Sequence, residues 1–306
     1  MKAQRATSLA GQTILVTGCG TKPKTSEFYD VVTGQPTHDP ILIDGVEHKM
    51  NIGTAIAYAC ARDGACVRMV ARSGDALRRI KTALDDRLSD DTLLSCHATD
   101  LLDAQSVANL VATLPTHQPL HWVQSVGLGA GNYAIKNDNP YLPVTGIETS
   151  LIRAELGIVE ATHHLMRELL ELFRQQRVNG TAQENRIVGV SSMTAVRGYI
   201  GGSAHGAAKG ALDRYLNAVM LESYLDNIFV TTVRPGGIDT GMYDHPDVQS
   251  AVKRAASGYG CPWSETGIRL APPSSVADAV IDVLRSSAHI TSFNLVAKGQ
   301  FPHEGS

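Results

Sequence analysis

Short apolar runs alternate with longer amphipathic stretches along the chain. Seven runs of five to seven residues have the apolar character of strands that are covered on both faces. These predicted strands are 13–17, 66–71, 93–98, 120–126, 187–191, 229–233 and 293–297. Apolar residues at helical spacing predict helices between them, at 51–62, 74–88, 104–114, 151–176, 203–225 and 276–285. The alternation predicts an α/β fold in which residues 1–306 form one domain around a doubly wound parallel seven-stranded sheet.

Composition narrows the class of partner. The chain has 306 residues, 43% of them hydrophobic and 19% charged, with a formal net charge of −3. This balance gives no reason to expect a nucleic acid or a membrane surface as a partner, and the longest apolar runs are too short to span a bilayer. The first ten residues lack the apolar core of a signal peptide, so we expect a cytoplasmic protein that acts on a small molecule.

Cysteines and histidines do not form a metal-binding pattern. The five cysteines are scattered and contain no Cys-x-x-Cys, which favours free thiols in a reducing compartment. His163 and His164 are adjacent on a predicted helix and point in different directions. Pro119 separates His117 from His121 and spoils a helical pair. We therefore expect no metal site.

One segment carries a recognisable catalytic spacing. Ser192 ends a predicted strand, His205 follows thirteen residues later, and Lys209 lies one helical turn beyond. This resembles the active-site segment of the short-chain dehydrogenase/reductase family, in which a Ser precedes a Tyr-x-x-x-Lys by the same distance. Ser192 and Lys209 are in register, and His205 stands in place of the tyrosine. The resemblance implies a Rossmann fold and a catalytic set of Ser192, His205 and Lys209.

A split glycine-rich loop supports the same resemblance. The family has Thr-Gly-x-x-x-Gly-Ile-Gly after its first strand, where the backbone approaches a pyrophosphate at a helix N-terminus. Here Gly18 opens the motif and Asn51, Ile52 and Gly53 resume it after an insertion of about thirty residues. Asn51 replaces the second glycine, and since Asn tolerates positive φ better than most residues, the turn remains possible.

The insertion, residues 22–50, contains Asp44-Gly45 between apolar-rich segments, which predicts a β-hairpin. Two interpretations stay open. The hairpin forms an arm beside the phosphates of the cofactor, or it is a surface elaboration used in packing between subunits.

Arg72 follows the second predicted strand, where members that use NAD carry an acidic residue. A guanidinium suits a 2′-phosphate, so NADP (NADPH) is the expected cofactor; the alternative is that Arg72 only meets solvent. The resemblance implies further cofactor contacts from the ends of other strands. They are Asp100 and Leu101, Val126 and Gly127, Lys209, and Pro235, Gly236, Ile238 and Thr240.

The role of His205 decides the reaction. An imidazole can donate a proton near neutral pH, but Lys209 nearby would disfavour its charged form. At the position of the family's water-organising Asn the alignment offers Ala154, with Glu155 next to it, so that relay is lost or changed. Three hypotheses follow: an NADPH-dependent carbonyl reductase with His205 as proton donor, a redox-neutral dehydratase, isomerase or cyclase with His205 as base, or an inactive nucleotide-binding module.

The substrate is less constrained. Tyr199 could supply a phenol or simply line the pocket. The resemblance makes 238–272 a substrate lid, and its side chains favour a small apolar or aromatic substrate; they include Met242, Tyr243, Tyr259, Cys261, Pro262 and Trp263. It also implies a homodimer or homotetramer assembled through 151–176 and 203–225.

Overall fold

The computed structural model describes residues 8–90, 92–127, 144–198, 202–246, 248–250 and 269–300. Its main sheet has seven parallel strands in the order β10-β9-β8-β7-β1-β5-β6. Their bounds are β1 Thr13–Thr17, β5 Cys66–Ala71, β6 Leu94–Ala98, β7 Leu120–Gln124, β8 Asn185–Val190, β9 Ile228–Pro235 and β10 Ser292–Leu295. Each predicted strand is found, with ends displaced by at most two residues. The order reverses beside β1, which is where sheets of this kind bind ligands.

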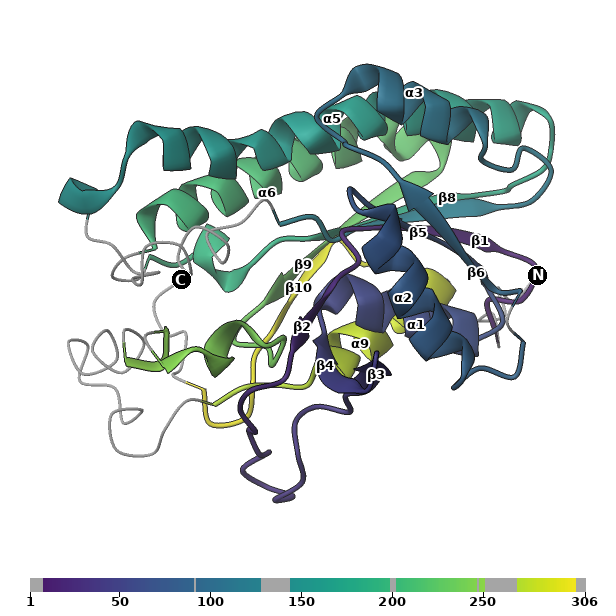
Figure 1. Cartoon of the computed structure of the whole chain (residues 1–306). Coiled ribbons are helices and arrows are strands. Elements are labelled where there is room, and N and C mark those ends of the chain that lie inside the picture. The colour runs from purple at the N-terminus through teal and green to yellow at the C-terminus, as the bar shows by residue number, and fades with distance from the viewer. Residues whose placement is uncertain are drawn as a thin grey trace.

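Helices cover both faces of the sheet (Figure 1). On one face lie α1 (Ile52–Arg62), α2 (Gly74–Asp85) and α9 (Pro273–Arg285). On the other lie α3 (Ala104–Ala112), α5 (Thr149–Val178) and α6 (Ser203–Ser223). Short 3₁₀ turns complete the described elements: η1 (Val144–Gly146), η2 (Met193–Ala195), η3 (Tyr224–Asp226) and η4 (Met242–Asp244). The six predicted helices and the predicted fold class are confirmed.

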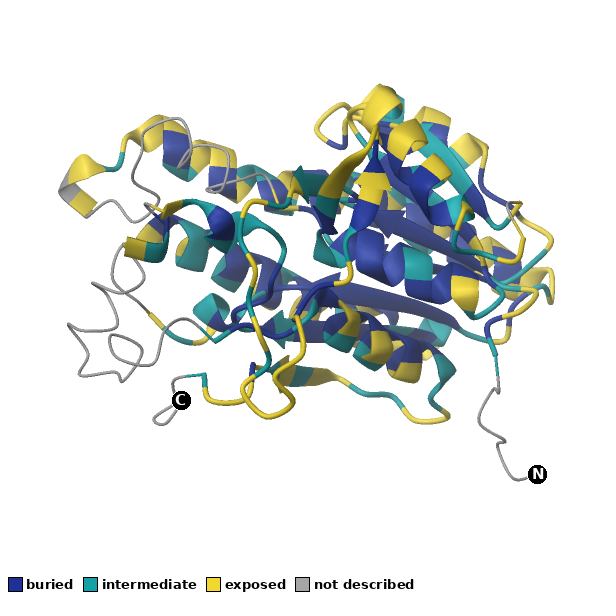
Figure 2. Cartoon of the chain, turned by 60° about the horizontal axis from the view of Figure 1, so that its bottom comes forward, coloured by how far each residue is buried: buried dark blue, intermediate teal, exposed yellow. Residues whose placement is uncertain are grey.

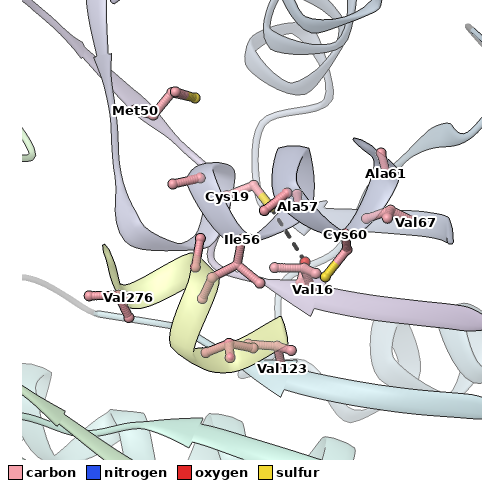
Figure 3. Packing of buried hydrophobic residues seen from close by; sticks show 14 of the residues in the cluster. Val16, Cys19, Met50, Ile56, Ala57, Cys60, Ala61, Val67, Val123 and Val276 are labelled. Atoms are coloured by element: carbon pink, nitrogen blue, oxygen red, sulfur yellow. Dashed lines mark hydrogen bonds between the residues drawn. The ribbon is translucent and has the colours of Figure 1, made fainter. Parts of the chain in front are cut away.

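The sheet separates two apolar cores. Along β1, Ile14 and Val16 point into the core under α1 and α9, while Leu15 points into the core under α5 and α6. Figure 2 shows the strands as an almost continuous buried layer between the helices. The α1 side is built from small residues, and Figure 3 shows Ala57 and Cys60 of α1 beside Cys19 and Val16. Small side chains let α1 approach the end of β1 closely, which matters for the loop between them.

The insertion in that loop folds into a second, three-stranded antiparallel sheet, which we call the arm (residues 21–50). Its strands are β2 (Thr21–Pro23), β3 (Ile41–Ile43) and β4 (Val46–Met50), in the order β2-β4-β3. Between β3 and β4, Asp44 has φ 51° and Gly45 has φ 77°. Two positive φ values in a two-residue loop are the pattern of a type I′ hairpin. The predicted hairpin turn is therefore found at Asp44-Gly45.

A buried ionic cluster fastens the arm to the loop that follows β9. Lys49 of β4 is fully buried, and its Nζ donates to Asp239 Oδ1 at 2.7 Å and to Asp244 Oδ1 at 2.8 Å. Thr37 Oγ1 donates to the other oxygen of Asp239 at 2.7 Å. The backbone amides of Thr25 and Ser26 donate to the other oxygen of Asp244. The arm thus packs on its own chain at the carboxyl end of the sheet.

Candidate active site and cofactor track

The glycine-rich loop brings β1 and α1 into very close contact. Gly18 has φ 88°, and a Cβ there would lie 2.4 Å from the carbonyl oxygen of Ser125. A Cβ at Gly53 would lie 2.7 Å from the carbonyl oxygen of Gly18. Both distances are too short for any side chain, so these two positions require glycine. The N-terminus of α1 is thereby brought close to the end of β1 at the switch point of the sheet, where folds of this kind bind anions.

Asn51 serves a different purpose from the one expected of a glycine substitute. Its φ is −76°, so tolerance of positive φ is not the reason for Asn here. It is the N-cap of α1: Oδ1 accepts from the amides of Thr54 at 2.9 Å and Gly20 at 3.2 Å, and Nδ2 donates to Gly18 O at 2.8 Å. The physical reason is the arm. Because the chain enters and leaves the arm between Gly20 and Asn51, the loop is closed by side-chain hydrogen bonds and not by a tight glycine turn.

The other predicted nucleotide residues lie at the carboxyl ends of neighbouring strands. Arg72 is exposed just after β5, and Ser73 caps α2 with Oγ accepting from the Ala76 amide at 3.2 Å. Asp100 is exposed after β6, and Leu101 is buried. After β7, Val126 is buried and Gly127 is exposed. Since β7, β1, β5 and β6 are adjacent in the sheet, this set forms one track along its edge.

The C-terminal segment closes over the predicted nicotinamide loop. Pro235 ends β9, and Gly236 lies so close to Gln300 that a Cβ would be 2.4 Å from Oε1 of that side chain. Gln300 Oε1 also accepts from the Gly237 amide at 3.1 Å. Ile238 is buried and bridges to Ala271, and Thr240 is half-buried. Gln300 Oε1 accepts from the nearby Ala297 amide as well, at 3.1 Å, but its contacts with Gly236 and Gly237 span more than sixty residues and leave no local signal in the sequence.

Ser192, His205 and Lys209 come to the same end of β8. Ser192 follows β8 and its Oγ accepts from the Thr194 amide at 3.2 Å. His205 lies in the first turn of α6, with 30% of its side chain exposed. Lys209, one turn later, is buried and donates from Nζ to Val190 O at 3.0 Å. The N-terminus of α6 packs on η2, since a Cβ at Gly206 would lie 3.2 Å from Thr194 O.

A carboxylate that the sequence analysis did not place joins this group. Glu155 of α5 is 4% exposed, and its Oε2 lies 3.4 Å from His205 Nδ1. Its other oxygen, Oε1, is buried without a hydrogen-bond partner among the described residues. The expectation that Ala154 occupies this place is wrong by one residue, because Ala154 faces solvent. The helical face held the signal: Leu151 and Ile158 are buried on the same side of α5 as Glu155.

The charges at this end are only partly compensated. Burial lowers the pKa of Lys209 to about 8, although the carboxylates of Glu155 and Asp213 act to raise that pKa. Asp213 is itself paired with Arg234, Oδ2 to Nη2 at 2.7 Å, and its Oδ1 has no partner in the described segments. A desolvated ammonium held by a single carbonyl is well placed to donate to ligand hydroxyls.

Some predicted features lie outside the described residues: Tyr199, most of the expected 238–272 lid with Tyr259, Cys261, Pro262 and Trp263, and residues 128–143. In the part of the chain that the structure describes, no group of three or more His, Cys, Asp or Glu side chains is arranged to hold a metal ion. None of the described helices is both long enough and apolar enough to cross a bilayer.

Curated relatives share the sequence at low identity. The chain is 25% identical over 239 residues to glycine betaine reductase ATRR of Emericella nidulans, covering 78% of this chain and 17% of that protein. It is 25% identical over 250 residues to 3-oxoacyl-[acyl-carrier-protein] reductase of Homo sapiens, covering 81% and 92% respectively. For the mouse 3-ketodihydrosphingosine reductase the chain spans 54% of the relative's length, so it matches only part of two of these proteins.

Solved structures share the fold. The 3-ketoacyl-(acyl-carrier-protein) reductase of Brucella melitensis, complexed with NADH, superposes with a TM-score of 0.67 at 18% identity over 96% of this chain and 100% of that one. An NADPH-bound short chain oxidoreductase of Pseudomonas aeruginosa PAO1, described as containing an atypical catalytic center, gives 0.66 at 18% identity over 96% and 97%. The short chain dehydrogenase family model matches residues 46–249, more than half of the chain. The chain belongs to the short chain dehydrogenase family and has the Rossmann fold of these solved structures.

Proposed function

We propose that this protein is an NADP(H)-dependent reductase of a small carbonyl substrate in which His205 supplies the proton. The arrangement around the imidazole carries the proposal. Nδ1 of His205 faces a buried carboxylate, while the described residues offer Nε2 no partner. His205 is partly exposed beside the Ser192 turn, so Nε2 is free to meet a substrate oxygen. Geometry of this kind is what a general acid needs.

The other residues fit defined tasks around a bound nicotinamide cofactor. When bound, the cofactor would supply the hydride that reaches the carbonyl carbon. Ser192 Oγ already accepts one hydrogen bond, so its own hydrogen is available for the carbonyl oxygen. Lys209 would hold the ribose hydroxyls with its desolvated ammonium. The two obligatory glycines, Gly18 and Gly53, would leave the α1 N-terminus open to the pyrophosphate.

Preference for NADP(H) is supported by Arg72 and by the cap of α2. Arg72 is exposed just after β5, and the next residue, Ser73, is the N-cap of α2. A positive side chain beside a helix N-terminus suits a 2′-phosphate. The P. aeruginosa structure contains NADPH, whereas the B. melitensis structure contains NADH, so the comparison leaves the choice to these residues.

A small apolar or aromatic carbonyl compound is the substrate class we favour. Met242 and Tyr243 lie half-buried in η4, just beyond the nicotinamide loop, and both would contribute apolar surface there. We also propose a homodimer or homotetramer, with Leu156 of α5 and Leu221 of α6 on the shared face because both are exposed on the two helices named for this contact.

The first experiment measures cofactor binding separately from catalysis. NADPH and NADH are titrated by nucleotide fluorescence, and NADPH should bind more tightly. Arg72→Ala should weaken NADPH by roughly 1–3 kcal/mol, the scale of a charge-assisted hydrogen bond. Arg79→Ala, a change to an exposed arginine in the helix that follows Arg72, is the control. Equal dissociation constants for the two cofactors in the wild type would contradict the NADP(H) preference.

The second experiment tests His205 with a panel of ketones. His205→Phe should lower kcat by about two to four powers of ten, which is the usual contribution of general acid catalysis, and leave NADPH affinity nearly unchanged. His205→Tyr should restore part of the activity where the pocket has room. If His205→Phe reduced ketones at the wild-type rate, another group would have to be the proton donor.

A redox-neutral reaction is the second candidate, favoured by one observation. A buried carboxylate on Nδ1 of an imidazole also suits a general base, because it stabilises the ring after Nε2 takes up a proton. Bound NADPH with no hydride transfer to any carbonyl compound would favour this candidate over the reductase.

A further inference from the structure

Glu155 stands out among the groups that the proposed reaction does not use. It is a carboxylate with 4% exposure in the second turn of the long helix α5, and a buried ionised side chain is costly unless it is fully partnered. Its Oε1 has no hydrogen-bond partner among the described residues, and its Oε2 has only His205 Nδ1 at 3.4 Å. A buried carboxylate with so few partners destabilises the folded protein. Its contact with His205 is therefore the feature to explain.

We propose that Glu155 is a positioning residue that fixes the tautomer of His205 and stabilises its protonated form. A carboxylate only accepts, so the Nδ1 that faces it must carry hydrogen. The neutral ring then has a bare Nε2, and the second proton of the imidazolium sits on Nε2, where the substrate would be. This inference rests on the reductase function proposed above and adds to it a residue that acts through His205.

The charges around His205 show why such a residue is needed. Lys209 lies four residues later on α6, so the two side chains are neighbours on one helix face, where like charges repel. Further along, Asp213 is neutralised by Arg234 of β9. The η2 turn packed against the helix contributes Ser192, Met193 and Thr194, none of them charged. Among the described residues, Glu155 from α5 is thus the anion that directly contacts the ring and offsets Lys209.

Both the proton and the hydride of the proposed reduction can be accounted for. The imidazolium Nε2–H bond would break and its proton would go to the carbonyl oxygen, while the carbonyl carbon would gain a hydride from bound NADPH, which would leave NADP⁺. The carbonyl compound is reduced to an alcohol, and His205 is left neutral with Nδ1–H still directed at Glu155. Solvent can return the proton, since 30% of the His205 side chain is exposed.

The test is Glu155→Gln, which keeps the shape and an acceptor oxygen and removes the charge. The descending limb of the kcat/KM pH profile should move about one pH unit lower, giving about tenfold less activity on that limb. Glu155→Asp should recover part of the shift. Glu160→Gln, at an exposed position on the same helix, is the matched control and should leave the profile unchanged.

A double-mutant cycle separates this role from a general effect on Lys209. In a His205→Phe background, Glu155→Gln should lower the rate no further, because the residue acts through the ring that is already gone. An equal loss in both backgrounds, with weaker NADPH binding in each, would assign Glu155 to Lys209 and overturn the proposal.

Nuclear magnetic resonance of the His205 ring gives a readout that needs no turnover. The neutral ring should be the Nδ1–H tautomer, and its titration midpoint should fall in Glu155→Gln. The opposite tautomer in the wild type, or an unmoved midpoint, overturns the proposal even where a variant folds poorly or the wild type reduces nothing. Failure of the reductase function alone would instead appear as absent hydride transfer with this ring behaviour intact.

Discussion

Two buried lysines at the carboxyl end of the sheet have opposite surroundings. Lys49, in the arm, is fully buried between Asp239 and Asp244, and all four carboxylate oxygens of that pair accept hydrogen bonds. Lys209, in the candidate catalytic cluster, is also buried, yet its Nζ donates only to Val190 O among the described residues. The carboxylate of Glu155 influences it without a direct ion pair.

The two lysines therefore differ in role: the charge of Lys49 stabilises the fold, whereas the charge of Lys209 is available to a ligand. Around Lys49 the protein supplies every partner itself, so nothing remains for a ligand. Around Lys209 three buried oxygens lack partners in the described residues: Glu155 Oε1, Asp213 Oδ1 and Thr194 Oγ1. Native proteins leave few such atoms, and each needs an explanation. Three more lie on Gln12, Asp85 and Gln124, but none of these accompanies a buried lysine of the candidate site. Buried polar groups that lack partners within the protein distinguish the candidate site from the Lys49 cluster, and burial alone does not.

Removing Lys49 should have the largest effect on stability. Lys49→Met leaves two buried carboxylates unpaired and should lower the free energy of unfolding by about 3–5 kcal/mol in a urea titration. The matched control is Arg79→Met, which breaks the exposed pair between Arg79 of α2 and Asp44 of the arm and should change stability by less than about 1 kcal/mol. Similar losses in the two variants would remove the structural role assigned to the Lys49 cluster.

Removing Lys209 should affect binding more than folding. Lys209→Met replaces a desolvated ammonium by an apolar chain of similar length, so the free energy of unfolding should change by less than about 1 kcal/mol. NADPH should bind about 1.5–3 kcal/mol more weakly in a fluorescence titration, the value of hydrogen bonds from a charged donor. A stability loss as large as that of Lys49→Met, with NADPH affinity intact, would reverse the comparison.

The smallest predicted effect is a pH dependence that belongs to Lys209. Burial lowers its pKa in the folded protein to about 8, whereas an unfolded lysine titrates near ~10.4. Between these values the unfolded chain binds more protons, so the penalty of the buried ammonium is relieved as pH rises. From pH 7 to pH 9 the wild type should gain about 1 kcal/mol of unfolding free energy relative to Lys209→Met. A constant difference in urea titrations across this range would show that Lys209 stays fully charged.

The sequence was sufficient wherever structure depends on local pattern. Apolar runs located the seven strands, and Asp44-Gly45 located the hairpin turn, because a two-residue turn is set by the residues in it. Glu155 was missed although its signal was also local. Alignment to a motif chose Ala154, whereas the buried face of the helix includes Glu155.

Contacts between residues far apart in the sequence could not be predicted from local patterns. Lys49 meets its two carboxylates 190 and 195 residues further along the chain, and such a contact leaves no periodic trace. The role of Asn51 was hidden for a related reason. Because Asn51 stands in place of a glycine, we expected it to serve backbone conformation. With the arm inserted, the backbone groups of Gly18, Gly20 and Thr54 need hydrogen-bond partners, and the Asn51 side chain provides them.

The closed base of the arm has a consequence for the entropy of the chain. Thirty residues separate Gly20 from Asn51, yet the Asn51 amide donates to Gly20 O at 3.0 Å and the Gly20 amide donates to Asn51 Oδ1 at 3.2 Å, so the insertion leaves and returns at one hydrogen-bonded pair of residues. Loop-closure entropy grows only logarithmically, by ~0.6 kcal/mol for each doubling of length. A long arm therefore burdens the nucleotide fold little more than a short one. Shortening or extending the 28–36 end should alter folding rates slightly and leave the β1–α1 junction unchanged.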